Sequence, residues 1–269
     1  MIPILFKIGP LEIGSYGVMM AMAFLITALV LARELRLRDM PAEWAYELVL
    51  WAALGGILGA RLYFILEHFP EFLADPLGMI FSRGGLTWYG GFFLGSLAVL
   101  WKISRLPIAT LELADIIAPL ILLGYAVGRI GCLLSGDGDY GFPTDLPWAM
   151  AFPNGLVPTD VPVHPTPIYE TLLSGLFFLI LWRFRRIATR GWMVSGLLLF
   201  YGLERFIVEF WRRTPAVFGW MTIAQIISVG LIMIGIGFGL YAWKTAERRR
   251  KEELQQLVQK TSVKMHSAS

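Results

Sequence analysis

Stretches of about 20 mostly apolar residues recur along the sequence, and they restrict the possible folds more than any other feature. An α-helix of that length crosses the hydrocarbon core of a bilayer. The stretches lie near residues 15–33, 44–66, 86–103, 111–134, 168–184, 192–211 and 217–243. Short polar or Pro/Gly-rich segments separate them, as expected where a chain leaves the membrane. We therefore predict an all-α, polytopic integral membrane protein with about seven transmembrane helices.

The composition supports this prediction. Hydrophobic residues make up 57% of the 269 residues, charged residues only 16%, and the mean hydropathy is +0.64. A soluble core of this size could not bury so much apolar surface. We expect one membrane-embedded domain, residues 1–244, and a charged cytoplasmic tail, residues 245–269. The first stretch has no basic segment before it and no small-residue cleavage site after it, so we expect it to be retained rather than removed as a signal peptide.

The basic residues predict the orientation, because Lys and Arg near span ends are retained in the cytoplasm. They follow the first, third, fifth and seventh stretches, whereas residues 135–167 contain no Lys or Arg. This Gly/Pro-rich loop and the N-terminus should face outward, and the C-terminus should be cytoplasmic. The net charge of +3 then needs only anionic membrane lipids as partners and no nucleic acid.

Ionisable residues inside the predicted helices need an explanation, because each costs roughly 2.5–3.5 kcal/mol at the bilayer centre. They must face one another, water or a polar ligand. The candidates are Arg61, Asp115, Arg129, Glu170, Arg205 and Glu209.

The two arginines near the outer side suggest a phosphate clamp. Arg205 and Glu209 lie four residues apart on one helical face, with Arg212 three residues further along. Arg129 lies at the outer end of the fourth predicted helix. A guanidinium group can donate two parallel hydrogen bonds to the oxygens of one phosphate, and a lipid phosphate is the anion available at that depth. The alternative is a set of ion pairs that join helices, for instance Arg205 with Glu170. Asp115 begins the fourth helix and is expected to serve its inner end.

Several short segments have a structural interpretation of their own. The glycines of GGLTWYGG at 84–91 and GRIG at 128–131 are typical of close helix packing. In HPTPIYE at 164–170, Thr166 and Pro167 are suited to a helix start. Cys132 is the single cysteine, so an intramolecular disulfide is excluded and a cysteine-based metal site is not expected. We interpret Cys132 as a packing residue.

Read in order, these segments resemble one family. They are Ile8-Gly9-Pro10, Tyr16-Gly17, Gly59-Ala60-Arg61, GGLTWYGG, Ala114 to Pro119, GRIG, Pro147-Trp148, HPTPIYE, and YGLERF at 201–206 leading to Val208-Glu209-Phe210. The chain is similar over nearly its whole length to the prolipoprotein diacylglyceryl transferases of the bacterial inner membrane.

The resemblance implies a reaction. It is the transfer of the diacylglyceryl group of phosphatidylglycerol to the lipobox cysteine in prolipoprotein signal peptides, with glycerol 1-phosphate released. The acceptor thiol is the nucleophile, so neither an enzyme nucleophile nor a metal or organic cofactor is expected.

The resemblance also implies roles for residues of this chain. Arg129 and Arg205 match arginines that contact the phospholipid headgroup, and Glu209 matches an important acidic partner. Tyr16, Gly141 and Glu170 fall on motif positions and are expected to bind substrate.

The chain departs from the family pattern at two places. Tyr89 stands where well-known members have His, and residues 132–141 replace an Asn-rich stretch. We expect Tyr89 to donate a hydrogen bond to the phosphate, with Glu209 or water as alternatives for handling the thiol proton. Ser135, Asp137 and Asp139 can still supply polar contacts, and Ser135 and Asp137 are included in the predicted substrate site.

Two other functions remain open from the sequence. A degenerate relative could bind phospholipid or lipoprotein without catalysis, which the departures at Tyr89 and Cys132 would allow. A small-anion transporter would also use buried arginines. Transporters are typically built from internal repeats and broken helices, and the sequence shows neither.

Overall fold

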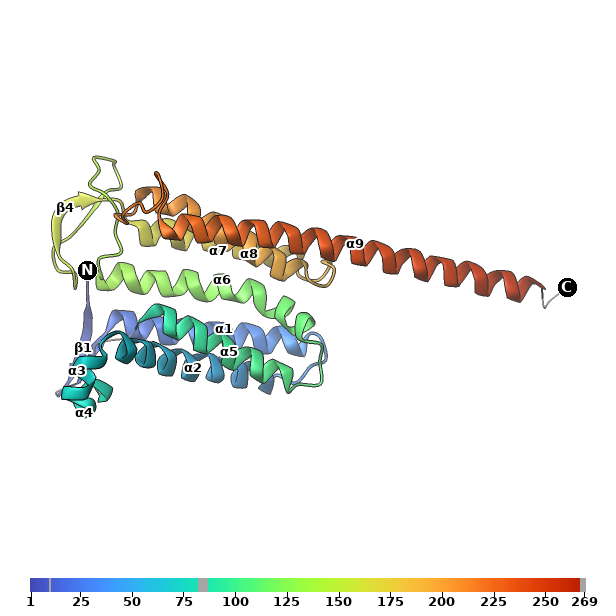
Figure 1. Cartoon of the computed structure of the whole chain (residues 1–269), viewed down its shortest axis with the longest axis horizontal. Helices are drawn as coiled ribbons and strands as arrows, with labels where there is room; N and C mark the ends of the chain where they lie inside the picture. The colour runs from blue at the N-terminus through green and yellow to red at the C-terminus, as the bar shows by residue number, and fades with distance from the viewer. Residues whose placement is uncertain (10, 82–86, 267–269) are drawn as a thin grey trace. The chain divides into compact units, whose positions relative to one another are not determined.

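A computed structural model describes residues 1–9, 11–81 and 87–266. The chain divides into two compact units, which are described separately: Met1–Met20 with Ala114–Ser269, and Ala21–Leu113. Helices dominate both units (Figure 1). Five of the described helices are long and apolar enough to cross a bilayer: Ser15–Arg36, Glu43–Glu67, Thr110–Ser135, Thr166–Phe184 and Ile223–Arg248. The predicted polytopic, helical membrane architecture is therefore confirmed.

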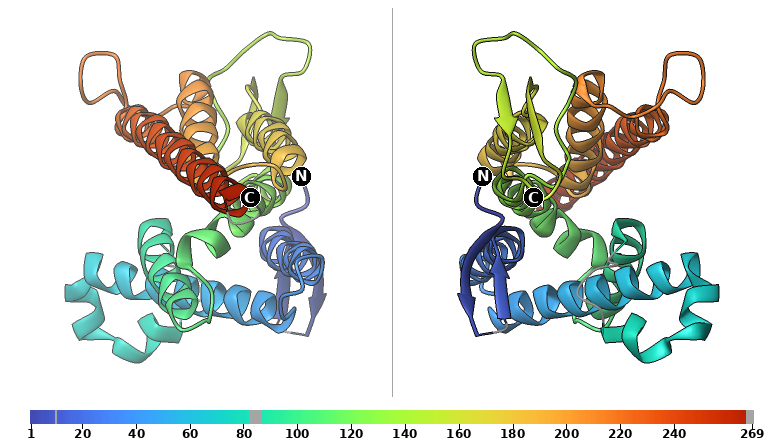
Figure 2. Two further views of the ribbon diagram at one scale, coloured as in Figure 1. Left: turned by 90° about the vertical axis from the view of Figure 1, so that its right-hand side faces the viewer. Right: turned by 90° about the vertical axis from the view of Figure 1, so that its left-hand side faces the viewer.

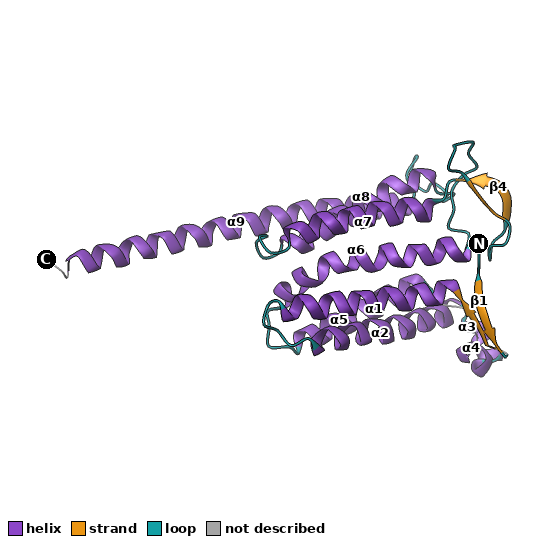
Figure 3. Ribbon diagram, turned by 180° about the vertical axis from the view of Figure 1, so that it is seen from behind, coloured by secondary structure: helices purple, strands orange, loops and turns teal. Residues whose placement is uncertain are grey.

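Figure 3 colours the helices purple and the strands orange. They are β1 (Ile4–Ile8), β2 (Leu11–Gly14), α1 (Ser15–Arg36), α2 (Glu43–Glu67), α3 (Phe69–Ala74), α4 (Pro76–Phe81), α5 (Trp88–Ser104), α6 (Thr110–Ser135), β3 (Met150–Phe152), β4 (Thr159–Val163), α7 (Thr166–Phe184), α8 (Trp192–Val208), a 3₁₀ turn (Glu209–Trp211) and α9 (Ile223–His266).

Two of the predicted spans coincide with shorter helices. α5 and α8 have 17 residues each, which corresponds to a length of about 25 Å. That is slightly less than the hydrocarbon core of a typical bilayer. The total of seven transmembrane helices therefore stays a prediction.

In the Ala21–Leu113 unit, α2 and α5 pack closely because glycines face each other. A Cβ on Gly59 would overlap the carbonyl oxygen of Gly90, and a Cβ on Gly90 would overlap that of Gly59. A Cβ on Gly55 would lie 2.9 Å from the Cβ of Ala98. The glycines of GGLTWYGG that the structure describes thus act in helix packing, as their sequence pattern indicates.

The other unit is built from α6, α7, α8 and α9. α8 and α9 run side by side (Figures 1 and 2), and Ser195 of α8 donates a hydrogen bond of 2.7 Å to the carbonyl oxygen of Gly235 in α9. Asp115 accepts backbone N–H groups of Gly191 and, at 3.0 Å, Val194, where α8 begins. It therefore satisfies unpaired donors at the N-terminus of α8, whereas the sequence analysis expected it to serve the inner end of its own helix, α6.

The Gly/Pro-rich segment between α6 and α7 folds onto a small core of its own. β3 and β4 pair antiparallel, and Tyr140, Phe152 and Val163 are buried together. The segment is joined to the turn after α8, because the N–H of Phe142 donates to the carbonyl oxygen of Trp211 at 2.9 Å. This connection brings the end of α8 next to the end of α6.

Both chain ends carry elements that the sequence pattern did not predict in this form. Near the N-terminus, β1 and β2 pair antiparallel, whereas the sequence analysis predicted an all-α protein. α9 continues without interruption from Ile223 to His266 (Figure 1), so the predicted tail at 245–269 begins inside a helix. Its separation from the membrane domain stays a prediction.

Candidate active site

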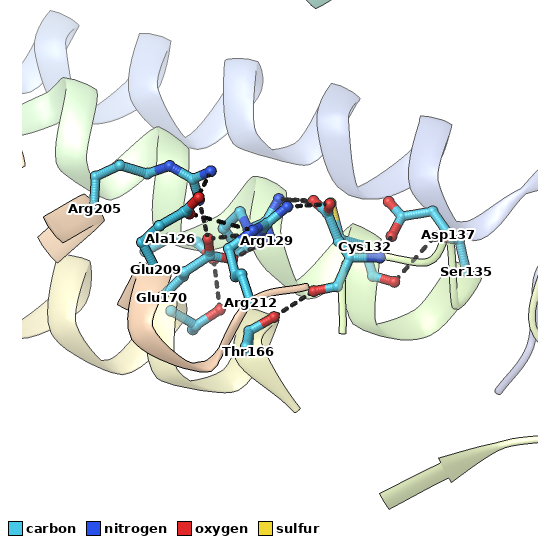
Figure 4. Close-up of polar contacts among 12 residues, drawn as sticks. Ala126, Arg129, Cys132, Ser135, Asp137, Thr166, Glu170, Arg205, Glu209 and Arg212 are labelled. Carbon is cyan, nitrogen blue, oxygen red and sulfur yellow. Dashed lines mark hydrogen bonds and ion pairs between the residues drawn. The ribbon is translucent and has the colours of Figure 1, made fainter. Parts of the chain in front are cut away.

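Three arginines surround one buried carboxylate, that of Glu170 at the start of α7 (Figure 4). Arg205 of α8 lies 3.1 Å from Oε1 of Glu170, and Arg212 lies 3.2 Å from the same oxygen. Arg129 of α6 forms an ion pair with Oε2. The side chain of Glu170 is 0% exposed, so these contacts replace all of its water.

Two further carboxylates complete the group. Glu209 lies 3.0 Å from Arg205 and 3.7 Å from Arg212, and its other oxygen accepts a 2.9 Å hydrogen bond from Thr222. Asp139 lies 2.6 Å from Arg129 and 2.5 Å from Arg212. We call Arg129, Asp139, Glu170, Arg205, Glu209 and Arg212 the arginine cluster.

The arginine cluster is balanced in formal charge, since three guanidinium groups face three carboxylates. Asp139 lies outside the helices, and its pKa shows the strength of the pairing. Burial alone would raise the pKa of this carboxyl, but Arg129 and Arg212 outweigh burial and lower it to about 2. Asp139 is therefore a carboxylate at neutral pH.

Backbone contacts position the residues of the cluster. A Cβ on Gly141 would overlap the carbonyl oxygen of Trp211 and lie 3.0 Å from the Cβ of His164, so only glycine fits there. This approach lets Gly141 and Arg212 form a β-bridge. Thr166 donates a hydrogen bond to the carbonyl oxygen of Asp139, which fixes the acidic residue against the start of α7. The motif position Gly141 thus has a steric explanation.

The ion-pair interpretation of the buried charges is seen in the structure, and the phosphate clamp stays a prediction. Arg205 does pair with Glu170, as the ion-pair alternative predicts. Arg129 pairs with the same Glu170, so the two arginines of the predicted clamp converge on one point. The side chain of Arg205 is 24% exposed against 11% for Arg129, so Arg205 is the more accessible of the two.

The segment that departs from the family pattern borders the cluster. Arg129 donates to the sulfur of Cys132 at 3.3 Å, and Cys132, Asp137 and Asp139 place ligand atoms within 4.8 Å of one another. The positive charge that faces Cys132 and Asp139 is the guanidinium of Arg129, which contacts both. Burial raises the pKa of Asp137, which lies beyond the end of α6. Asp137 is thus close to the cluster without being one of its ion-pair partners.

Three other predicted residues have different positions. Ser135 is buried, and its hydroxyl donates to the carbonyl oxygen of Cys132 at 3.1 Å, so this hydroxyl stabilises the end of α6. Tyr16 is 43% exposed and interacts electrostatically with Cys132 and Asp137. Arg61 belongs to the other unit and donates to the carbonyl oxygen of Met79 at 3.1 Å.

Tyr89 is described by its backbone alone. Its backbone belongs to α5, but its side chain is outside the described part of the chain. The expected hydrogen bond from Tyr89 to a phosphate therefore stays a prediction.

The sequence analysis missed Glu204, the residue before Arg205. Its side chain is completely buried, and neither carboxylate oxygen has a hydrogen-bond partner among the described residues. It interacts electrostatically with Glu170 and Arg205. A signal was present, because Glu204 lies inside the predicted helix at 192–211, where the cost of a buried charge singles out Arg205 and Glu209. It is a fourth acidic group beside a cluster that is already balanced.

Comparison with known proteins places this arrangement in context. Residues 3–241 match the sequence model of a family described as prolipoprotein diacylglyceryl transferase. The chain is 38% identical over 255 residues to the phosphatidylglycerol–prolipoprotein diacylglyceryl transferase of Pseudomonas putida, covering 90% of this chain and 94% of that protein. It is 38% identical over 258 residues to the protein of that name from Pseudomonas fluorescens, with 91% and 94% covered. The protein of that name from Coxiella burnetii is 37% identical over 260 residues, with 91% and 97% covered.

Proposed function

Since the chain belongs to the prolipoprotein diacylglyceryl transferase family, we propose that it transfers the diacylglyceryl group of phosphatidylglycerol to the lipobox cysteine of prolipoproteins. It is a membrane transferase of lipoprotein maturation. The thiol sulfur attacks the glycerol carbon that carries the phosphate ester. A C–S bond forms, the C–O bond breaks with its electron pair on the phosphate oxygen, and glycerol 1-phosphate leaves. The thiol proton passes to Glu209 or to water as the C–S bond forms.

The observation that carries the proposal is the convergence of Arg129, Arg205 and Arg212 on Glu170. Their guanidinium groups bind a carboxylate in this arrangement, and the same geometry binds phosphate oxygens. We place the phosphate of the lipid beside Glu170, at the more exposed Arg205. Negative charge grows on the leaving phosphate during C–O cleavage, so positioned guanidinium groups stabilise the transition state more than the bound lipid.

The remaining residues of the cluster act on the arginines. Glu209 is braced by Thr222 at 2.9 Å and contacts Arg205 at 3.0 Å, so it orients the guanidinium that meets the lipid. Asp139 orients Arg129 and Arg212 from the other side. Tyr89 is proposed to add a hydrogen bond to the phosphate. Tyr16, Ser135, Asp137 and Gly141 belong to the proposed substrate region, where Gly141 and Ser135 act by shaping the backbone.

We also propose that the protein is a multi-pass protein of the bacterial inner membrane, with the N-terminus outside and the C-terminus in the cytoplasm. The asymmetry of basic residues supports this orientation. A reporter that is active only outside the cytoplasm should work when fused after Asn154 and fail after Arg186. Reversed signals would put the arginine cluster on the wrong face for a lipobox peptide that has crossed the membrane.

The direct test is transfer by the purified protein. Labelled phosphatidylglycerol and a lipobox peptide should yield a peptide that carries diacylglyceryl on its cysteine, detected by mass, and a peptide with serine instead should stay unmodified. Arg129→Lys keeps the charge but loses the paired hydrogen bonds of guanidinium, so transfer should fall on the order of 100-fold. Complementation of a bacterium depleted of its own transferase gives the same answer in cells. Lipid binding without transfer would establish the degenerate relative instead, and anion flux through vesicles would establish a transporter.

A further inference from the structure

A cavity lined by Arg212 and Arg213 opens beside the arginine cluster. Its volume is about 420 Å³, and it is lined by Gly138, Tyr140, Arg212, Arg213 and Thr214. A cavity of this size lies in the range for small molecules and is too small for a lipid with two acyl chains. Arg212 belongs to both places, since it lines the cavity and also contacts Glu170 and Glu209.

The walls of the cavity are held by contacts that need no ligand. Tyr140 is buried, its hydroxyl donates to the carbonyl oxygen of Val157 at 3.0 Å, and its ring stacks on Phe152 with 4.9 Å between ring centroids. Arg212 is fixed by Asp139 at 2.5 Å. The guanidinium carbon of Arg213 lies 4.4 Å from the centroid of the Tyr140 ring, a cation–π contact. The site is therefore formed in advance.

Arg213 differs from the arginines of the cluster in its charge balance. Arg129, Arg205 and Arg212 each contact at least two carboxylates. Among the residues that the structure describes, no carboxylate forms an ion pair with Arg213; its described partner is the neutral ring of Tyr140. A guanidinium has five N–H donors, and a cation–π contact occupies none of them as an ion pair would, so they can bind an anion. Thr214, whose hydroxyl can donate a hydrogen bond, lines the same cavity.

The proposed reaction releases a phosphate monoester, whose additional negative charge a cation such as Arg213 can bind. The phosphodiester of phosphatidylglycerol carries one negative charge, whereas a phosphate monoester carries about −1.5 to −2 at pH 7. The arginine cluster is balanced by its own carboxylates, so it offers no additional positive charge when the diester becomes a monoester. Arg213 follows Arg212 in the sequence and lines the same cavity, and no described carboxylate forms an ion pair with it.

We propose that Arg213, Arg212 and Thr214, with Arg213 held on the ring of Tyr140, form a binding site for the phosphate-monoester leaving group, separate from the place of the lipid phosphodiester. The inference rests on the proposed function. Its ligand class is a phosphate monoester of a small polyol, here glycerol 1-phosphate. The site receives this group after C–O cleavage and draws it from the arginines that the next lipid must occupy.

The test compares product inhibition of Arg213→Gln with that of the parent in the peptide transfer assay. Gln keeps polar groups but removes the charge, so the inhibition constant of glycerol 1-phosphate should rise about tenfold or more, while KM for phosphatidylglycerol changes less than about twofold. Arg213→Lys keeps the charge without the paired geometry and should lie between the two. Lys7→Gln is the control, because Lys7 is an exposed cation in the same unit that pairs only with Glu12 at 2.5 Å among the described carboxylates. Glycerol 1-phosphate should inhibit the Lys7→Gln variant as strongly as it inhibits the parent.

A second measurement does not depend on turnover. In particles that contain only zwitterionic lipid, glycerol 1-phosphate should raise the unfolding midpoint of the parent more than that of Arg213→Gln, since a ligand stabilises the state that it binds. If the parent transfers no lipid, the proposed function fails, and this shift still tests the cavity by itself. If Arg213→Gln raises KM for phosphatidylglycerol but leaves product inhibition unchanged, the cavity serves the lipid headgroup and the inference is wrong. Equal inhibition constants and equal thermal shifts in parent and variant would also overturn it.

Discussion

Replacement of Glu170 by Gln should destabilise the protein strongly and make it dependent on an anionic lipid. The amide keeps the shape of the side chain but leaves three arginines facing two carboxylates. Because Glu170 is fully buried and contacts Arg205 at 3.1 Å and Arg212 at 3.2 Å, the loss should match that of a buried ion pair with one partner removed, about 3–5 kcal/mol. For a chain of this size, that corresponds to a fall of about 6–20 °C in the unfolding midpoint.

The assay is thermal unfolding of the purified protein in zwitterionic detergent, with and without phosphatidylglycerol. Phosphatidylglycerol should raise the unfolding midpoint of Glu170→Gln by more than it raises that of the parent, because its phosphate replaces part of the missing negative charge. Glu47→Gln is the matched control, since Glu47 pairs with Lys102 at 2.5 Å but its side chain is 46% exposed. A surface pair of this kind contributes less than about 1 kcal/mol. An unchanged midpoint in Glu170→Gln would refute the view that its carboxylate holds the arginines together.

Other changes test other parts of the site. Glu204→Leu should leave the unfolding midpoint unchanged or raise it, because neither carboxylate oxygen has a hydrogen-bond partner among the described residues; a clear fall in the midpoint would show that the attraction of Arg205 outweighs the cost of burial. Arg205→Lys should lower lipid transfer on the order of 100-fold while folding is retained; near-parent turnover would make Arg205 purely structural. Gly141→Ala should abolish most transfer because its Cβ would displace the Trp211 backbone, whereas Gly175→Ala, with open space in α7, should preserve transfer and stabilise the helix by roughly 1 kcal/mol. The pairing of Asp139 stabilises the folded state fully above its unfolded pKa of about 3.9 and is lost as pH falls through about 2, so an Asp139-linked loss of the unfolding midpoint should begin only below about pH 4.

The helices could be predicted because each apolar stretch has one low-energy conformation in a bilayer. Backbone groups in lipid must bond within their own segment, so length and hydropathy alone identify α1, α2, α6, α7 and α9. The two hairpins could not be predicted in the same way. The pairing of β3 with β4 depends on the buried contacts of Tyr140, Phe152 and Val163, which come from distant positions in the chain.

The cost of buried charge located most of the site before its geometry was known. Arg129, Glu170, Arg205 and Glu209 were singled out because ionisable side chains in a membrane need partners, and all four meet in one cluster. The contribution of Arg212 was less evident. The sequence analysis expected it on the same helical face as Arg205, but α8 ends at Val208 and the 3₁₀ turn at Trp211, so Arg212 has extended backbone. Its contacts with Asp139 and Glu170 depend on the close approach at Gly141. That approach is a backbone contact between distant segments, which no helical periodicity reveals.

The balance of charge in the cluster determines how it can bind a lipid. An unpaired arginine would be costly inside a membrane protein, so the three guanidinium groups are folded against carboxylates of equal number. A phosphate therefore gains most of its binding energy by taking over contacts rather than by meeting excess charge. Arg205 is the exposed partner, and Glu209 keeps it oriented from 3.0 Å while phosphate oxygens replace its 3.1 Å contact with Glu170. The carboxylate of Glu170 then stabilises the site before the lipid binds, and it also competes with the lipid phosphate for Arg205. Glu170→Gln should therefore bind phosphatidylglycerol more tightly than the parent and unfold more easily.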